Sequence, residues 1–302
     1  MKRVYVILFF SVWAMLLSAQ HYFGAAVGGL ATYQMDNVDK TTSRLGGGGE
    51  IGAVYRLQKN KFLFQIGLGF NYSVSVLGVD SMSLSAKMTD TGGTPFTYRG
   101  VVYDRVDRAN MTELSVPLMF GFKLSSFYAL VGAKFAYPLM STTHQTALLT
   151  TYGDYNGMFY EDFFDMPEHG YANGQHVKSV GKVDFLYDVR ACAELGGSWT
   201  LSELNDSELG IGLFAEYGVL NTLKGGNNNL VDVDYSQYMS ITMNHIYSTL
   251  SKNSAVVNNL RVGLRVSLLF PASDVDSKHR KGKKCMCIDY VYRKHPAYRN
   301  RR

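Results

Sequence analysis

The sequence predicts an all-β protein, an eight-stranded antiparallel up-and-down transmembrane β-barrel with a disordered basic C-terminal tail. Three observations predict this fold. Eight segments alternate apolar and polar side chains with the period of two that is typical of a half-buried strand. Short and long connections alternate between these segments. Their charged residues fall almost entirely on the polar face, as in a membrane barrel whose apolar face meets lipid.

The start of the chain predicts a secretory signal peptide. Lys2 and Arg3 precede the apolar run Val4–Leu17, and Ser18 and Ala19 are the small residues expected before a cleavage site. An N-terminal membrane anchor is the alternative. We therefore expect a signal peptide at 1–19, an outer-membrane barrel at 20–271 and a basic periplasmic tail at 272–302.

Eight segments along the chain show this alternation. The predicted strands are Tyr22–Gln34, Gly48–Gln58, Phe62–Leu77, Thr112–Ser125, Phe127–Met140, Lys182–Leu201, Glu208–Leu220 and Asn258–Phe270. In the same order, their apolar faces carry Phe23, Val27 and Tyr33; Ile51 and Tyr55; Phe64, Ile66 and Leu68; Leu114, Val116 and Leu118; Val131, Phe135 and Tyr137; Phe185, Val189 and Leu195; Leu209, Ile211 and Leu213; Leu260, Val262 and Leu264. Pro117 has the opposite parity, and because proline removes a ladder hydrogen bond we expect a bulge or irregularity near it.

The polar faces carry seven acidic and seven basic residues. They are Glu50, Arg56, Glu113, Lys123, Lys134, Lys182, Asp184, Asp188, Arg190, Glu194, Glu208, Glu216, Arg261 and Arg265. An eight-stranded barrel leaves an interior just wide enough for side chains to fill. We predict that all of them except Lys182 and Glu208 form an ion-pair network that fills the lumen. A water-soluble sandwich would show the same alternation, and a narrow channel would use the same charges.

The lengths of the connections predict the topology. The short connections are Lys59–Lys61, Ser125–Ser126 and Ser202–Ser207, and the long ones are Met35–Leu45, Gly78–Met111, Ser141–Gly181 and Asn221–Val257. Outer-membrane barrels have short periplasmic turns and longer extracellular loops. Both ends of the chain are therefore expected in the periplasm.

The third long connection combines aromatic and acidic residues in a way that suggests a surface-binding loop. Its candidate residues are Tyr155, Phe159, Tyr160, Glu161, Asp162, Phe163, Phe164 and Asp165. Exposed aromatic residues are enriched in interfaces. An ordered loop whose aromatics pack over the barrel mouth or against lipid headgroups is the alternative. The carboxylates have no recognisable ligand spacing, so no metal site is predicted.

The tail gives the chain its positive charge. Between Lys278 and Arg302 there are ten Lys or Arg residues and one acidic residue, Asp289. Such a block attracts anionic headgroups, peptidoglycan carboxylates or an acidic envelope protein, unless it is simply a solvated tail. Nucleic acid is not an expected partner in the periplasm. Cys285 and Cys287 are too close together for the usual redox or zinc pattern.

The histidines and the remaining cysteine give no sign of catalysis. A nucleophile needs a base within hydrogen-bond reach and a third group that orients the base. The seven histidines lie at strand ends, in loops or in the tail, and Cys192 has lumen parity and is expected to be a buried free thiol. We predict no catalytic residues and no cofactor.

Short motifs resemble a known family. Leu114–Leu124 and Phe127–Leu139 resemble consecutive strands of the outer-membrane β-barrel proteins common in Bacteroidetes, the porin-like and PorT-like families, and Phe214–Asn221 resembles their penultimate strand. The last strand fits the signal by which barrels are recognised for insertion, with Arg261, Gly263, Val266, Leu268 and Phe270 in the signal positions.

The resemblance implies that outer-membrane lipid and the barrel-insertion machinery are partners. It also implies, for some members, a link to type IX secretion. Three functions stay open at this point. The surface loops and the tail act in binding or in envelope integrity, the chain is a component of a secretion or envelope-assembly complex, or it is a narrow channel.

Overall fold

The computed structural model describes residues 19–39, 41–90, 92–156, 171, 173–226, 229–234, 240–250 and 255–272. For residues 86, 233, 234, 240 and 241 it describes the backbone alone. The predicted signal peptide up to residue 18 and the tail from residue 273 lie outside the described residues.

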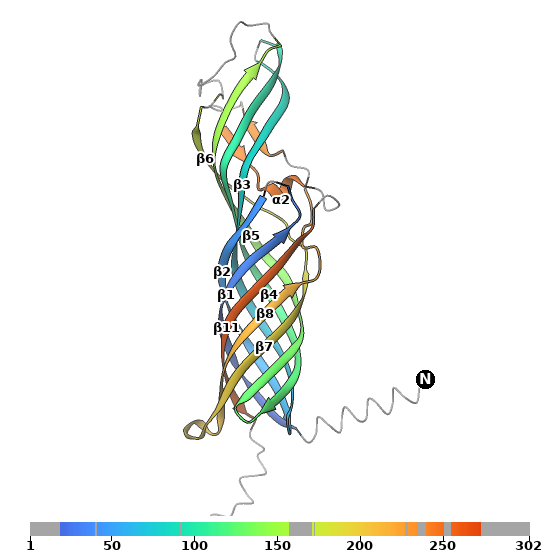
Figure 1. Cartoon of the computed structure of the whole chain (residues 1–302), viewed down its shortest axis with the longest axis vertical. Helices are drawn as coiled ribbons and strands as arrows, with labels where there is room; N and C mark the ends of the chain where they lie inside the picture. The colour runs from blue at the N-terminus through green and yellow to red at the C-terminus, as the bar shows by residue number, and fades with distance from the viewer. Residues whose placement is uncertain are drawn as a thin grey trace, which may run out of the picture.

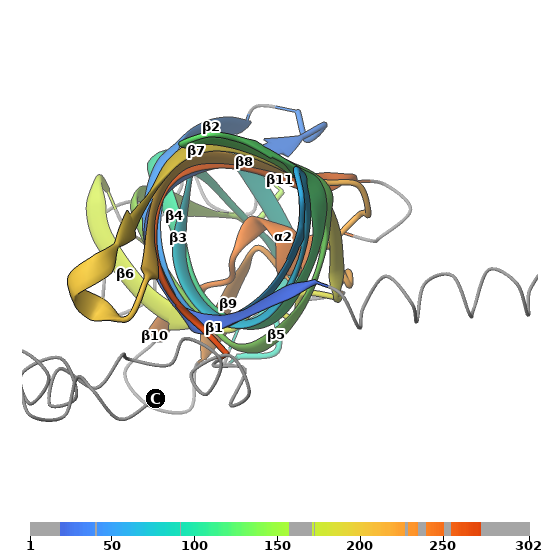
Figure 2. The same ribbon diagram turned by 90° about the horizontal axis from the view of Figure 1, so that it is seen from below.

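Eight antiparallel strands form a closed ring. They are β1 (Gln20–Asp36), β2 (Thr41–Lys59), β3 (Phe62–Thr89), β4 (Pro95–Leu124), β5 (Phe127–Asp154), β7 (Asp188–Leu201), β8 (Ser207–Gly218) and β11 (Val257–Pro271). Each pairs with its neighbours in the order β4-β3-β2-β1-β11-β8-β7-β5, and a β4–β5 pairing closes the ring. Figure 2 shows this ring along its axis. The predicted all-β barrel is confirmed.

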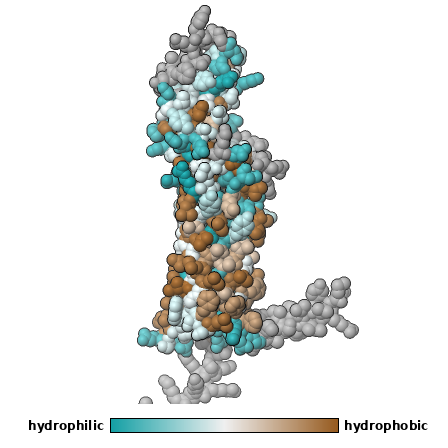
Figure 3. Space-filling view, viewed as in Figure 1, coloured by the Kyte–Doolittle hydropathy of each residue, from teal (hydrophilic) through white to brown (hydrophobic). Residues whose placement is uncertain are grey.

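The outer surface of the ring is a belt of exposed apolar side chains. Val27, Ile51, Val131, Leu213 and Leu264 are all more than half exposed in it. Two sets of exposed aromatic residues border the belt: Tyr33, Tyr72, Tyr137, Tyr187 and Tyr217 on one side, and Phe23, Phe62, Phe122, Phe127, Trp199 and Phe270 near the short turns. In the described strands, no charged residue occupies an outward position between these two girdles. Figure 3 shows the apolar band on one face. It is the surface that a membrane barrel presents to lipid.

Tight turns join the strands at one end of the ring. Asn60 and Ser125 turn the chain between β2 and β3 and between β4 and β5, with φ angles of 54° and 57°. A short 3₁₀ turn, Ser202–Leu204, precedes Asn205 and Asp206 between β7 and β8, and their φ angles are also positive, at 55° and 59°. Asn, Asp and Ser tolerate this left-handed conformation better than branched residues do. The three short connections therefore lie where the sequence predicts them.

The expected long loop Gly78–Met111 is wrong, because most of it is strand. β3 continues to Thr89 and pairs with β4 from Pro95 onward. The side-chain parity reverses where Asp104 adopts a φ of 51° and the β4–β5 register shifts between Tyr103 and Val106. The period of two in side-chain direction is interrupted at that bulge, although the strand pairing continues on both sides of it.

β5 also continues as strand beyond its predicted end. It runs to Asp154, so the first part of the expected loop Ser141–Gly181 is strand. Its outer edge is paired with β7 near the turns and with β6 (Gln175–Gly181) further up. We define the arm as β6 together with residues 81–89 of β3, 95–103 of β4 and 148–154 of β5. Figure 1 shows the arm projecting beyond the ring.

A hairpin of β9 (Val231–Asp234) and β10 (Ser240–Met243) packs against the arm. Met243 lies in one apolar cluster with Val102, Leu149 and Val177. Phe96, Tyr98 and Tyr171 form a second cluster further out. The short helix α2 (Ile246–Thr249) follows the hairpin. No helix among the described residues is long and apolar enough to cross a bilayer.

One smaller expectation needs correction. The strand predicted over Lys182–Leu201 begins at Asp188, because the preceding residues leave the ladder and only Phe185 makes a bridge, to Leu223. The irregularity expected at Pro117 is confirmed: the β3–β4 pairing is interrupted between Leu118 and Ser115 and keeps its register, so it is a gap in the ladder.

The belt predicts that a charge at its centre destabilises the protein in lipid. Leu213 lies on β8 midway between Tyr217 and Leu209, the partner of Trp199. Leu213→Arg should lower the free energy of unfolding in lipid vesicles by about 2–4 kcal/mol. Val101→Arg, at an exposed position of the arm, should change it by less than about 0.5 kcal/mol. Urea titration of the two variants gives both values, and an equal cost would show that lipid does not cover the belt.

Candidate functional site

The lumen holds a network of nine charged side chains. Six of the eight strands supply these residues, which are connected by ion pairs: Glu50, Glu113, Lys134, Asp188, Arg190, Glu194, Glu216, Arg261 and Arg265. Glu113 bridges two guanidinium groups: it pairs with Arg190, and its Oε2 is 2.7 Å from Nη1 of Arg261. Arg265 pairs with both Glu50 and Glu194. All nine project inward because they share the inward parity of their strands.

A second group lies nearer the turns. Glu208 accepts from Arg56 at 2.7 Å and from Lys123 at 2.5 Å. Tyr128 joins the two groups, because its hydroxyl donates to Glu194 at 2.7 Å while the Arg56 guanidinium lies over its ring. Gln65 accepts from Arg56 as well. Together the two groups contain six carboxylates and six cations, so the lumen carries no net charge.

Asp184 does not belong to this network, and its assignment to the lumen is wrong. It pairs with Lys224 at 3.0 Å on the outside, where the two side chains are 71% and 56% exposed. The reason is that Asp184 precedes the first residue of β7, so strand parity does not direct it inward. The other eleven residues assigned to the network lie together in the lumen, and Glu208 joins them.

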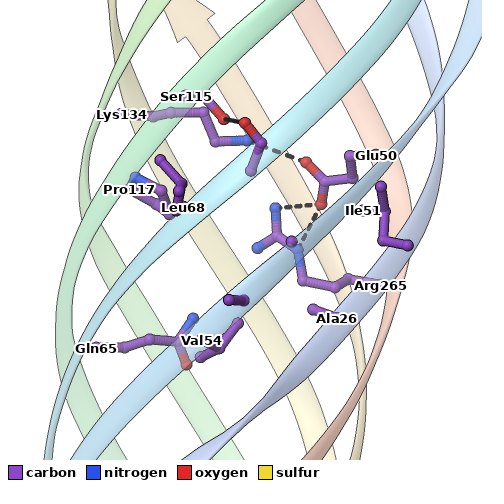
Figure 4. A pocket seen from close by; sticks show the side chains of 13 residues that line it. Ala26, Glu50, Ile51, Val54, Gln65, Leu68, Ser115, Pro117, Lys134 and Arg265 are labelled. Atoms are coloured by element: carbon purple, nitrogen blue, oxygen red, sulfur yellow. Dashed lines mark hydrogen bonds and ion pairs between the residues drawn. The ribbon is translucent and has the colours of Figure 1, made fainter.

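Little free space is left among these side chains. A cavity of about 30 Å³ lies beside Glu50, Lys134 and Arg265, which is room for one or two water molecules. Figure 4 shows Lys134 and Arg265 reaching Glu50 from two sides, with Pro117 at the edge. Toward the turns, the inward side chains of Met119, Tyr128 and Leu130 form an apolar layer with Leu63 and Cys192.

The opposite end of the lumen is closed by a cork that we define as residues 243–250. Ile246 and Tyr247 of α2 are buried in an apolar cluster with Leu77, Met111 and Val257 from the ring. Seen along the axis, α2 lies within the outline of the ring in Figure 2. Arg105 and Asp107 of β4 hold the cork from below.

Polar contacts fix the cork. Nε of Arg105 donates to Asp107 at 2.7 Å, and both side chains are fully buried. Asp107 accepts from the backbone N–H of Ile246 at 2.9 Å, and Arg105 donates to the carbonyl of Asn244. Tyr247 donates its hydroxyl to Asp36 at 2.8 Å. The cork is thus tied to β4 and β1.

His245 is the titratable group at the centre of these contacts. Nδ1 accepts from the N–H of Tyr247 at 3.2 Å, which caps α2, and lies 4.0 Å from Asp107. Burial lowers the pKa of His245 to about 4, and Arg105 adds to this effect while Asp107 opposes it. The neutral ring is therefore the form that fits the closed cork.

The other predicted site residues are spread over the molecule. Arg261 points into the network and Gly263 packs against the ring of Phe214, whereas Val266 and Phe270 face outward in the belt. Leu268, also in the predicted insertion signal, pairs with Leu209. In the predicted surface-binding loop, Tyr155 stacks on Phe96 at 4.8 Å. The remaining loop residues, Phe159 to Asp165, lie outside the described residues, as do Cys285 and Cys287. Cys192 is a buried free thiol.

Comparisons with known proteins add little to this geometry. No family model matches the chain, and no curated protein matches it. Among solved structures it is similar to Ail, the attachment invasion locus protein of Yersinia pestis, with 9% identity, a TM-score of 0.29, and 83% of this chain and 99% of that chain covered. It is also similar to Neisserial surface protein A, with 9% identity, a TM-score of 0.30, and coverage of 82% and 97%. A third is the outer membrane protease OmpT of Escherichia coli, with 7% identity, a TM-score of 0.27, and coverage of 83% and 96%. The barrel rests on the strand pairing described above, and these likenesses carry no argument about function.

Removing one carboxylate from the network should expose how much of the stability depends on it. Glu113→Ala leaves Arg190 and Arg261 without their shared partner inside the lumen. We expect it to lower the free energy of unfolding by about 3–5 kcal/mol, because a buried charge is left uncompensated. Asp184→Ala removes an equally charged residue from an exposed pair and should cost less than about 1 kcal/mol. Urea unfolding in detergent micelles compares the two, and similar costs would contradict a buried network.

Acid should loosen the cork through His245. The pKa of His245 is about 4 in the folded protein and about 6.5 in an unfolded chain. The stability that the neutral ring contributes is therefore complete above about pH 6.5 and is lost as pH falls toward 4. Hydrogen exchange of residues 243–250 should speed up over this range. In His245→Asn, which can still cap α2, the increase should be smaller, and an identical increase would assign the effect to the carboxylates Asp107 and Asp36.

Proposed function

We propose that this chain is a non-enzymatic outer-membrane protein that acts by binding, and that the arm is its binding element. The observation that carries the proposal is the contrast between a filled ring and an elaborated arm. The lumen is occupied by an apolar layer, a neutral ion-pair network and a cork. The arm extends the strands of the ring as a paired sheet. Such a sheet holds exposed side chains in fixed positions, as a binding surface requires.

The proposed location rests on the belt and on the direction of the connections. The apolar belt fits lipid, the predicted signal peptide fits export, and the tight turns at one end fit the periplasmic side. This orientation places the arm outside the cell and the end of β11 in the periplasm. Membership of the porin-like or PorT-like families is part of the proposal, and it is supported by the sequence motifs alone.

Conduction and catalysis are the competing functions, and the geometry favours neither. An ion that crosses the lumen would have to displace the cork and break pairs such as those of Glu113 and Glu216. The His245–Asp107 pair resembles part of a catalytic constellation, but the two side chains are 1% and 0% exposed, so a substrate does not reach them. We therefore propose that the lumen serves stability.

A part in a secretion or envelope-assembly complex is the second candidate. It is supported by the basic tail, whose ten Lys and Arg residues lie on the periplasmic side in the proposed orientation. In this case the partner would be an envelope protein and the contact would lie at the opposite end of the molecule from the arm.

A photocrosslinking amino acid placed at either end distinguishes the two candidates. One position is Val101, exposed on the outward face of the arm, and the other is Leu204, exposed in the turn between β7 and β8. In intact cells we expect Val101 to give adducts with molecules supplied in the medium, such as proteins or glycans of the natural surroundings. We expect Leu204 to give none of these.

The opposite pattern would overturn binding by the arm. If Val101 gives no adduct and Leu204 gives envelope proteins, the complex-component candidate replaces the first. A chain stopped after Pro271 provides the control, because adducts that depend on the tail disappear in it while β11 stays intact.

A further inference from the structure

A row of basic residues crosses the outer surface where the ring meets the arm. Arg44 of β2, Val76 of β3, Arg108 of β4, His144 of β5 and Val180 of β6 are successive partners in the sheet. They therefore lie side by side on one face. Arg44, Arg108 and His144 are exposed on that face. We call these three residues the basic row.

The basic row lies on the water side of the tyrosine girdle. Val76 is four residues beyond Tyr72 on β3, which is roughly 13 Å along the strand. Tyrosine girdles mark the boundary between hydrocarbon and headgroups. The row is therefore at the depth of the headgroups, directly above the apolar belt.

Arg44 and Arg108 flank β3, and the Arg44 side chain lies over it. Their backbones are separated by two strand spacings, roughly 10 Å. The Arg44 guanidinium lies across Gly78, with Nε 3.0 Å from the point that a side chain at Gly78 would occupy. Because Gly78 has no side chain, the Arg44 side chain can extend from β2 across β3. It extends toward Val106, which pairs with Gly78 and lies two residues from Arg108. Two guanidinium groups on either side of one strand match the oxygens of a single phosphate group.

Neither arginine is neutralised by a carboxylate within the part of the chain that the structure describes. None of the ion pairs among the described residues includes Arg44 or Arg108, whereas Arg99, higher on the same face, is paired with Asp154 at 2.9 Å. The acidic residues that follow on the same strands, Asp80 and Asp104, lie four residues further from the belt. The positive charge is therefore concentrated on the membrane side of this face.

We propose that Arg44 and Arg108, with His144 at the edge, bind the phosphate of an anionic lipid headgroup in the outer leaflet. The inference rests on the proposed outer-membrane location. A lipid is the occupant, and not free phosphate, because the site continues into the apolar belt, where Val74 and Tyr72 offer a surface to the acyl chains of the same molecule. Basic clusters beside a membrane surface are typical sites for anionic headgroups.

The test uses the full chain in nanodiscs of phosphatidylcholine that contain a small fraction of lipid A. One arm uses lipid A with its phosphates, a second uses dephosphorylated lipid A, and a third adds inorganic phosphate to the first. Native mass spectrometry counts the lipid A that the released protein retains. The variants are Arg44→Gln/Arg108→Gln and, as a matched control, Arg99→Gln.

The wild-type chain should retain phosphorylated lipid A, and the double variant should retain about tenfold less. Arg99→Gln should behave like the wild type. Equal retention of dephosphorylated lipid A, or equal retention by the double variant, would overturn the proposal. Displacement of the lipid by millimolar phosphate would show an anion site without lipid specificity and would also overturn it.

Two controls keep the outcome clear. All three side chains are on the surface, so folding is expected, and heat-dependent gel migration selects the folded barrel for measurement. If a folded chain enters nanodiscs but shows no preference, the lipid site fails while the proposed membrane location stands. If the chain enters no bilayer at all, the proposed location fails first.

Discussion

The structure depends on one requirement, that every backbone N–H and C=O inside a bilayer finds a partner within the protein. An open sheet edge in hydrocarbon leaves several unsatisfied groups, each of which costs several kcal/mol. Here β11 pairs with both β1 and β8, and the β4–β5 pairing completes the circle. Once the circle is closed, each residue has only two directions, toward lipid or toward the lumen. The apolar belt and the charged interior follow from that choice.

The interior solves a second problem, because polar side chains that face inward must also satisfy each other. Six carboxylates and six cations pair with one another with no net charge. Tyr128 connects the two groups, and Gln65 accepts from Arg56. Arginine suits this role because it offers several donors in a fixed plane and stays charged. Arg265, for example, pairs with Glu50 and Glu194 while its guanidinium lies over Phe214.

The ring and most of the network were predictable from the sequence because both follow from strand parity. Arg261 and Arg265, four positions apart within β11, had to share a direction once a period of two was recognised. Parity fails where the ladder is irregular. Asp184 precedes its strand and so was assigned wrongly. The parity reversal at Asp104 interrupts the alternation within the first half of β4, and the expected loop took in this half of β4 and the end of β3.

The cork was beyond sequence reasoning for a different reason. Arg105 and Asp107 are more than a hundred residues from His245 in the sequence. No local sequence pattern predicts a contact over such a separation. Glu208 carried a signal, since it has inward parity, but its role depends on Arg56 of β2 and Lys123 of β4, which belong to strands that do not pair with β8.

The continuity of β3, β4 and β5 from the ring into the arm has a mechanical consequence. A load applied at the tip of the arm, near Gly92, is carried along strands that are held by neighbours on both sides within the belt. These hydrogen bonds are loaded along the strands, so they share the force and do not open one after another. Resistance to such a pull is set by the rate of unfolding and not by equilibrium stability. Under such a load the arm and the ring are therefore expected to yield together.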